Sequence, residues 1–526
     1  MRVPSIIKTL AILAAAMLAA CSTRGGSAIP PTGTQPSSGA GVTQTIVGLG
    51  DSLTAGEQSS GVLGSATVPL PDPTTLFSPI GAIGIVPPTQ ENGFFSVLYS
   101  AAKGSTWAAQ ANPTSSVLPL IAGPGIGNQI LPANPAYTGG IPFATLPGRS
   151  SCDAFNQSAY SYASVVGSVR MNPTATTYDL GIPSLTLHEA IAMYQPTTTS
   201  CVAIYPTPAN AAQAEIDALQ SLVSGESENF YPVMEKYSPP GSEVTPLQAA
   251  ASLHPTLTTV WLGANDLLRY AFSGGVAPGL DTTTAQVKSD MTTIIATLQH
   301  AGSDVIVADL PNIIQTPQFA IVGIPPGGQA QCAIQTWLPC VLADVGYSWT
   351  NAEAATNVLI STYSFLAPSG TNYAYLNESG AVYILGGGTL TAAQNGTYFL
   401  TAAFGVQVQS VNAAINAGIQ AAASANHAAY VPIDQIFAGI YSGSGTYFNE
   451  AASINPGICC TLAFGGGLLS LDGLHPSDTG YALIASVFAQ TANTAFGTSI
   501  PAINPAGAYD GLGGIYAPYP DPYAQH

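Results

Sequence analysis

A serine stands at the end of a short β-branched run near the start of the chain. The run from Thr43 to Leu49 leads into Gly50-Asp51-Ser52-Leu53, and a possible helix follows. A serine at a strand-to-helix turn is exposed, and the amino end of the helix places backbone N–H groups beside it. Ser52 is therefore a candidate nucleophile, although a Gly-Asp-Ser turn on its own is a commonplace structural feature.

Far downstream, a carboxylate stands three residues before an imidazole in Asp472-Gly473-Leu474-His475. A carboxylate at this spacing can hydrogen-bond the imidazole, fix its tautomer and raise its basicity, as the acidic member of a serine triad does. His475 is then a candidate general base, and Asp472 the acid that orients it. Taken alone, this motif is better explained as a helix-entry turn that ends a loop.

A third segment, Gly263-Ala264-Asn265-Asp266, follows the strand that we expect from Thr258 to Leu262. Carboxyl ends of parallel strands are where α/β proteins build their sites. Asn265 can donate a side-chain N–H to a developing oxyanion, while Gly263 lets the backbone turn sharply. The structural alternative is a strand-terminating turn in which Asp266 caps the following helix.

The fourth segment is the least specific. Gly181 lies in Tyr178-Asp179-Leu180-Gly181-Ile182-Pro183 and is a candidate for a backbone N–H donor to the same oxyanion. Taken alone, Gly181 is better explained as an ordinary loop glycine.

Together the four segments resemble the blocks of the GDSL, or SGNH, hydrolase family, in the family's order. The sequence IVGLGDSLTAG from residue 46 to 56 is similar to the family's first block, and the resemblance spans about residues 43 to 494. It implies that the family's Ser, Gly, Asn and His fall on Ser52, Gly181, Asn265 and His475, and that the Asp of its DxxH block falls on Asp472.

The resemblance also implies a mechanism: two-step acyl transfer with Ser52 as nucleophile and no metal or organic cofactor. The N–H groups of Ser52 and Gly181, with the Asn265 side chain, would form the oxyanion hole. One position departs from the family pattern. Many members carry Asn two residues before the second-block Gly, where this chain has Asp179, and Gly167 is a poorer match for that Gly.

The elements that must position these residues alternate as in parallel α/β sheets. Strands are predicted at 43–49, 258–262, 304–308 and 428–433, and helices at 210–223, 284–300, 406–425 and 477–494. By resemblance, the fold class is α/β: a three-layer α/β/α, flavodoxin-like domain with a mainly parallel sheet of about five strands. Long Gly- and Pro-rich stretches, at about 61–147 and 316–400, are expected to be loop insertions beside the substrate cleft.

The first residues read as an export signal. Arg2 and Lys8 precede a short apolar stretch that ends in Leu18-Ala19-Ala20-Cys21, which resembles the lipobox of bacterial lipoproteins. We therefore expect a signal peptide at 1–20, lipidation of Cys21, a flexible tether at 21–42, the hydrolase domain at 43–497 and a Pro/Gly/Tyr-rich tail at 498–526. An ordinary signal peptide with an incidental cysteine is the alternative.

Composition limits the partners. The chain of 526 residues carries 9 Lys+Arg against 27 Asp+Glu, a net charge of -18, and charged residues make up only 7%. This excludes nucleic-acid binding, which needs clustered cations, and favours an uncharged substrate. The resemblance implies that this substrate is a small-molecule or lipid ester. Contact with a membrane is expected only through the lipid anchor. The expected location is the cell envelope (outer membrane or cell surface), and the alternative is a secreted protein. The oligomeric state stays open.

Six cysteines besides Cys21 suggest disulfides in an exported protein: Cys152, Cys201, Cys332, Cys340, Cys459 and Cys460. Their spacing does not fit a metal site. The expected function is carboxylic ester hydrolysis by a lipase or short-chain esterase. A polysaccharide O-acetyl esterase and a non-catalytic surface lipoprotein that binds lipid or glycan are the alternatives.

Overall fold

The computed structural model describes residues 39–58, 62, 89–104, 117–121, 175–194, 230, 232–234, 236–237, 242–275, 281–316, 375–376, 399–441, 468–469, 474–503 and 505. The chain divides into two units, 1–35 and 36–526, and every described residue belongs to the second. The strands of this unit are β1 (Ile46–Gly50), β2 (Asp179–Gly181), β3 (Leu257–Trp261), β4 (Asp304–Ala308), β5 (Tyr375–Leu376), β6 (Phe399–Leu400) and β7 (Ala429–Val431). The helices are η1 (Gly39–Gly41), α2 (Ser52–Ala55), α4 (Thr89–Asn92), α5 (Phe94–Lys103), α9 (Leu187–Ala192), α11 (Pro246–Ser252), α12 (Ala264–Phe272), α13 (Thr284–His300), η5 (Ile313–Gln315), α19 (Ala402–Ala425), α20 (Ile433–Tyr441) and α22 (Asp478–Phe496).

Five strands form one parallel sheet in the order β2-β1-β3-β4-β7. The chain leaves β1 for β2 on one side and returns to β3 on the other, so the strand order reverses at β1. In open α/β sheets, the crevice outside the carboxyl ends of the strands at such a reversal is the usual ligand site. β5 and β6 pair separately as an antiparallel ribbon.

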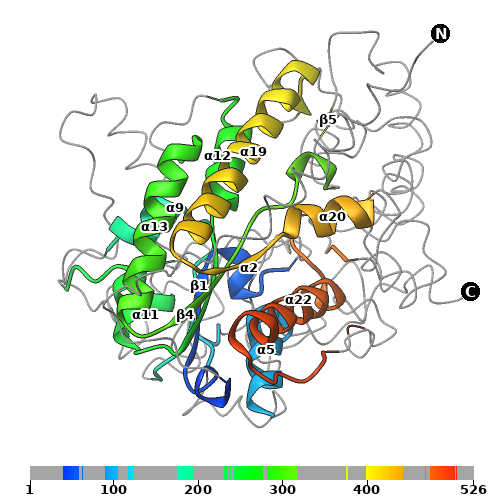
Figure 1. Cartoon of the computed structure of the whole chain (residues 1–526). Helices are drawn as coiled ribbons and strands as arrows, with labels where there is room; N and C mark the ends of the chain where they lie inside the picture. The colour runs from blue at the N-terminus through cyan, green and yellow to red at the C-terminus, as the bar shows by residue number, and fades with distance from the viewer. Residues whose placement is uncertain are drawn as a thin grey trace, which may run out of the picture. The chain divides into compact units, whose positions relative to one another are not determined.

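Helices cover both faces of the sheet. α5 packs on α22 on one face, while α13 packs on α19, α9 and α11 on the other (Figure 1). The first face has an aromatic core, in which Phe94 meets Trp261 edge-to-face at 5.4 Å and stacks on Phe488 at 4.8 Å. The prediction of a three-layer α/β/α fold with about five parallel strands is therefore confirmed.

Most predicted elements exist at the predicted places. β4 and α13 have the predicted bounds, while β1, β3, β7, α19 and α22 differ from the predictions by a few residues. α13 begins after Thr283, whose side chain accepts the Gln286 N–H. α22 begins after Ser477, whose side chain accepts the Gly480 N–H and so caps the helix in the same way. The predicted helix at 210–223 lies outside the described residues.

β2, α4 and α5 are among the elements that were not predicted. β2 has only three residues, too few for a visible periodicity. α4 and α5 lie within the stretch expected to be a loop insertion at 61–147, and α5 buries Phe94 and Phe95 in the core. α4 and α5 therefore belong to one helical layer of the domain and are not part of a loop insertion.

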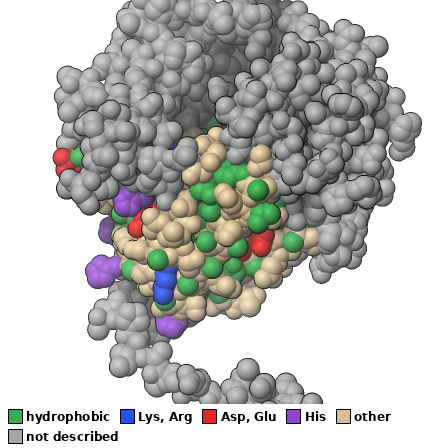
Figure 2. All heavy atoms as spheres, turned by 90° about the horizontal axis from the view of Figure 1, so that it is seen from above, with side chains coloured by type: hydrophobic (Ala, Val, Ile, Leu, Met, Phe, Trp, Pro, Cys, Tyr) green, Lys and Arg blue, Asp and Glu red, His purple; other side chains and the backbone are tan. Residues whose placement is uncertain are grey.

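The described surface carries few charges. Figure 2 shows a face on which neutral polar and hydrophobic side chains prevail and acidic, basic and His side chains are scattered. Within the described ranges, no helix has both the length and the apolar character needed to span a membrane.

Candidate active site

Three loops of the site meet because three neighbouring strands end at the same level. Gly50, the last residue of β1, pairs with Gly181 at the end of β2 and with Trp261 at the end of β3. Ser52 follows β1, and Asn265 follows β3. The sheet register therefore places the turns after β2, β1 and β3 side by side at the carboxyl edge.

Ser52 is the first residue of α2, a single helical turn. Asp51 caps the turn, since its Oδ1 accepts the Leu53 N–H at 3.0 Å. Gly56 closes the turn in the left-handed conformation, with φ of 74°. Gly50 has to be glycine because a Cβ there would lie 1.9 Å from the Thr54 hydroxyl oxygen. A serine at the amino end of a helix has its own N–H directed away from the helix, beside its hydroxyl.

His475 reaches this serine from the other end of the chain. Its Nε2 lies 2.8 Å from Ser52 Oγ, and both residues are buried. The imidazole is held by the start of α22: Ser477 N–H donates to Leu468 O, and Asp478 accepts from the side chains of Gln58 and Asn92 at 2.6 and 3.0 Å. The sequence prediction that Ser52 and His475 meet is thus matched by the geometry.

The carboxylate predicted to orient the imidazole, Asp472, lies outside the described residues. A different carboxylate does face the ring. Glu57 Oε2 lies 3.9 Å from His475 Nε2, the nitrogen that also faces Ser52. Glu57 is therefore placed beside the reacting atoms and not on the Nδ1 side, where an orienting acid would bind. Sequence analysis did not identify Glu57, because the first block ends at Gly56.

Gly181 packs against the nucleophile turn. A Cβ on it would lie 2.2 Å from the backbone nitrogen of Ala55, so only glycine lets β2 approach α2 this closely. Its N–H donates to Asp179 Oδ1 at 2.9 Å. The backbone N–H that was predicted to bind an oxyanion is therefore already hydrogen-bonded within the chain.

The turn that follows β2 holds a strained residue. Leu185 N–H donates to Ile182 O at 3.1 Å, and Ser184 has φ of 71°. This is the pattern of a type II turn, with Pro183 at its second position and the left-handed residue, normally glycine, at its third. Ser184 N–H donates to no acceptor among the described residues. Sequence analysis missed Ser184, although the proline before it is a signal for such a turn.

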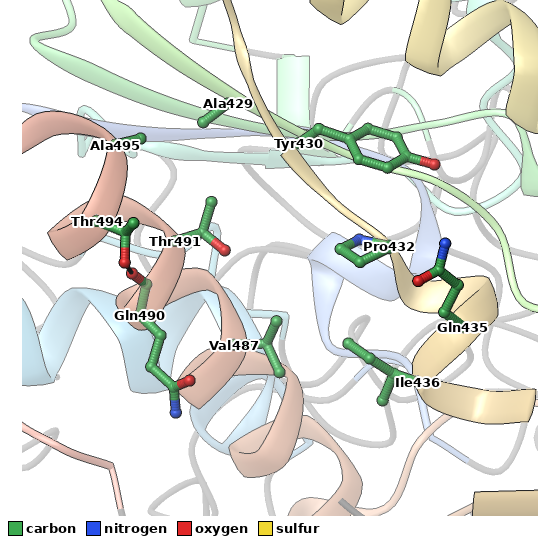
Figure 3. A pocket seen from close by; sticks show the side chains of 10 residues that line it. All are labelled: Ala429, Tyr430, Pro432, Gln435, Ile436, Val487, Gln490, Thr491, Thr494 and Ala495. Atoms are coloured by element: carbon green, nitrogen blue, oxygen red, sulfur yellow. Dashed lines mark hydrogen bonds between the residues drawn. The ribbon is translucent and has the colours of Figure 1, made fainter. Parts of the chain in front are cut away.

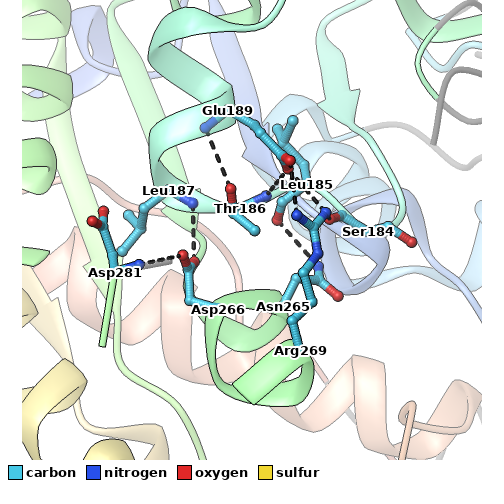
Figure 4. Close-up of polar contacts among 9 residues, drawn as sticks. All are labelled: Ser184, Leu185, Thr186, Leu187, Glu189, Asn265, Asp266, Arg269 and Asp281. Atoms are coloured by element: carbon cyan, nitrogen blue, oxygen red, sulfur yellow. Dashed lines mark hydrogen bonds and ion pairs between the residues drawn. The ribbon is translucent and has the colours of Figure 1, made fainter. Parts of the chain in front are cut away.

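Asn265 binds this turn from α12. Its Nδ2 donates to Leu185 O at 3.1 Å, and the next residue, Asp266, accepts the Leu187 N–H at 3.0 Å (Figure 4). One amide N–H of Asn265 is thereby used, and the second is available to a substrate. Asn265, predicted to follow the strand at 258–262, is the second residue of α12, four residues after β3 ends.

Burial raises the pKa values of three acids around the site. It raises the pKa of Asp51 to about 7, against the lowering effect of the Leu53 N–H, and that of Asp266 to about 7. It raises the pKa of Asp179 to about 8. Because desolvation disfavours a charged carboxylate, these acids reach neutral pH partly or largely protonated. Local negative charge near the nucleophile is thereby reduced.

A separate cavity of about 570 Å³ lies between β7, α20 and α22. Tyr430, Gln435 and Gln490 are among the ten residues labelled in Figure 3, and neither Ser52 nor His475 is one of them. In the part of the chain that is described, no group of three or more His, Cys, Asp or Glu side chains could hold a metal ion.

A serine and a histidine in contact at the carboxyl edge of a parallel α/β sheet are typical of serine hydrolases. Residues 46–488 match the model of the GDSL-like lipase/acylhydrolase family, and the chain belongs to this family. Membership makes it a hydrolase of ester substrates in general. No curated protein and no solved structure matches the chain.

Proposed function

We propose that this protein is a carboxylic ester hydrolase in which Ser52 is the nucleophile and His475 its general base. The observation that carries the proposal is the 2.8 Å contact between Ser52 Oγ and His475 Nε2, two side chains 423 residues apart in the chain. A buried imidazole at this distance can remove the hydroxyl proton as the oxygen attacks a carbonyl carbon.

Two backbone donors and one side-chain donor are proposed to stabilise the oxyanion: the N–H groups of Ser52 and Ser184 and the amide of Asn265. Ser184 is proposed here in place of Gly181, whose N–H donates to Asp179 Oδ1. Each such donor typically contributes a factor of about 100 to 1000 in kcat.

The reaction then has two halves. Ser52 Oγ forms a bond to the carbonyl carbon as His475 takes its proton, and the bond to the leaving alkoxide breaks as His475 returns that proton to it. In the second half, a water molecule loses a proton to His475 and attacks the acyl carbon. The bond to Ser52 breaks, the acid leaves, and the proton returns to the serine. Asp472, three residues before His475, is the proposed acid on Nδ1; its support is the sequence spacing.

The proposed substrate is an uncharged ester. Charged residues are only 7% of the chain and its net charge is -18, so anionic substrates would be repelled. Short-chain or longer acyl esters follow from this balance. Activity on p-nitrophenyl esters of graded chain length, compared with acetate release from acetylated xylan, separates an acyl-chain esterase from a polysaccharide O-acetyl esterase.

The decisive experiment is labelling with a fluorophosphonate probe. Wild-type protein truncated before the domain should be labelled and should hydrolyse short-chain esters, while Ser52→Ala should do neither and still unfold at the wild-type temperature. Ester turnover by Ser52→Ala at the wild-type rate would reject Ser52 as nucleophile. A folded wild type that is neither labelled nor active would instead favour a binding protein.

The proposed location is the cell envelope, with the protein anchored by a lipid on Cys21. The support is the sequence alone: the apolar stretch that ends in Leu18-Ala19-Ala20-Cys21. Cys21→Ser should move the protein from the membrane fraction to the soluble fraction and abolish incorporation of labelled palmitate. Membrane association that survives this change would exclude the lipid anchor as its cause.

A further inference from the structure

The first turns of α12 bind the loop after β2 at several consecutive points. Asn265 binds Leu185 O and Asp266 binds the Leu187 N–H, as described above. Arg269, one turn after Asn265, binds the carbonyl of the strained residue Ser184 through Nη2 at 2.7 Å. Because residues four apart lie on the same face of a helix, Asn265 and Arg269 reach the same loop together (Figure 4).

The guanidinium of Arg269 is fixed in turn by Glu189 on α9. Nη1 and Nη2 lie 2.8 and 3.1 Å from the two carboxylate oxygens, a two-pronged contact that sets the plane of the guanidinium. The side chains of Arg269 and Glu189 are 12% and 3% exposed, so water competes little with this pair. Glu189 also accepts the N–H of Thr186, the cap of α9, at 2.9 Å.

Neither residue is needed for the acyl-transfer steps, and the ion pair is expensive to bury. A buried ion pair contributes little stability compared with well-packed apolar residues. The role of this pair is therefore better explained by the neighbouring backbone that it orients. What it orients here is a turn in an unfavourable conformation. Ser184 has φ of 71°, where an L side chain is strained, and the turn stays in that conformation only while its neighbours hold it.

We propose that Arg269, locked by Glu189, is a positioning residue that holds the Ile182–Leu185 turn and Asn265 in register for oxyanion binding. The inference rests on the proposed acyl-transfer function. Arg269 touches neither Ser52 nor His475 by any contact that the described residues make; it acts through the Ser184 carbonyl. Loss of the guanidinium lets Ser184 relax towards negative φ, which displaces the Leu185 carbonyl that holds the Asn265 amide.

The test compares Arg269→Met with Lys103→Met. Lys103, on α5, likewise donates to two backbone carbonyls, Thr43 O and Gln44 O, but these precede β1 at the opposite end of the strand from Ser52. All rates are divided by the number of sites labelled by fluorophosphonate at completion, so that unfolded molecules do not count. Arg269→Met should lower kcat by about 10- to 100-fold with KM changed less than threefold, because displacement of an oxyanion donor affects the transition state more than the ground state. Lys103→Met should keep the wild-type kcat per labelled site.

A second substitution separates positioning from loss of stability. Glycine adopts positive φ without strain, so Ser184→Gly should keep the turn in place without the guanidinium and restore about tenfold of the kcat lost in Arg269→Met. Arg269→Lys should be defective too, since an ammonium cannot make the two-pronged contact. If Arg269→Met does not fold, Arg269→Lys and Glu189→Gln carry the same expectation of lower kcat per labelled site.

Unchanged kcat per labelled site in every folded variant at Arg269 and Glu189, or no recovery on adding Ser184→Gly, would overturn the positioning role. A wild type that neither labels nor turns over esters would overturn the proposed function itself. The two failures are therefore distinguished by the wild-type control.

Discussion

Burial of the Asp179 carboxyl group beside the Ser52 turn is expected to make the free energy of unfolding depend on pH. The Asp179 side chain is 1% exposed, and burial raises its pKa from 3.8 to about 8, against the lowering effect of the Gly181 N–H. The folded pKa exceeds the unfolded one, so the native state keeps a proton that the unfolded chain has lost between those two values. Stability from this group is greatest at low pH and declines as the pH rises towards 8.

Asp179→Asn replaces the protonated acid by a neutral group of the same shape. The amide oxygen can still accept the Gly181 N–H, and the amide does not titrate. Between pH 5 and pH 7 the wild type should lose about 2.6 kcal/mol relative to the variant, since each pH unit between the two pKa values corresponds to about 1.4 kcal/mol. The variant should therefore gain stability over the wild type as the pH rises.

Urea unfolding of both proteins at pH 5, 6 and 7 measures this difference. Asp304→Asn on β4 is the graded control: burial raises the pKa of Asp304 only to about 6, so its effect should saturate earlier and be smaller. A stability difference between Asp179→Asn and wild type that is the same at pH 5 and pH 7 would refute the reasoning. Ester hydrolysis should persist in Asp179→Asn, because the geometry of the turn is kept.

Three further predictions concern the site and its supports. Gly181→Ala should destabilise the fold by about 3 kcal/mol or more and abolish probe labelling of Ser52, because the new Cβ would lie 2.2 Å from the Ala55 nitrogen. Thermal unfolding measures the first effect and probe labelling the second. A stable and active variant would contradict this tight packing. Asp478→Ala should lower stability by about 2–4 kcal/mol and lower kcat, since the buried Gln58 amide and the partly buried Asn92 amide lose this acceptor close to the histidine in sequence. A fall in stability alone would show that the histidine is held by other contacts. Glu57→Gln should raise kcat/KM for esters with an anionic leaving alcohol relative to neutral ones, because the carboxylate lies 3.9 Å from His475 Nε2, the atom that protonates the leaving group. Equal ratios in Glu57→Gln and wild type would mean that this carboxylate does not affect leaving-group choice.

Much of the framework of the fold, and the two side chains that meet at its carboxyl edge, could be predicted from the sequence. β4 and α13 were predictable because each has a clear hydrophobic pattern and, for the helix, a capping Thr283. Ser52, Asn265 and His475 could be named as candidates because each lies in a short motif beside a helix start, where local sequence and position in the fold are linked. The family resemblance then supplied the order in which these segments had to assemble.

The sequence could not show which donors near Ser52 are already hydrogen-bonded, because this depends on contacts in the folded chain. Gly181 looked like a donor, but its N–H is bound by a residue two positions away and its α-carbon packs on α2. The strain at Ser184 and the contacts of Arg269 and Glu189 arise between segments about 80 residues apart. Side-chain periodicity reports the face on which a residue lies and carries no information about the partner that it meets there. Contacts between distant segments therefore depend on sheet register and helix packing, which the folded chain alone determines.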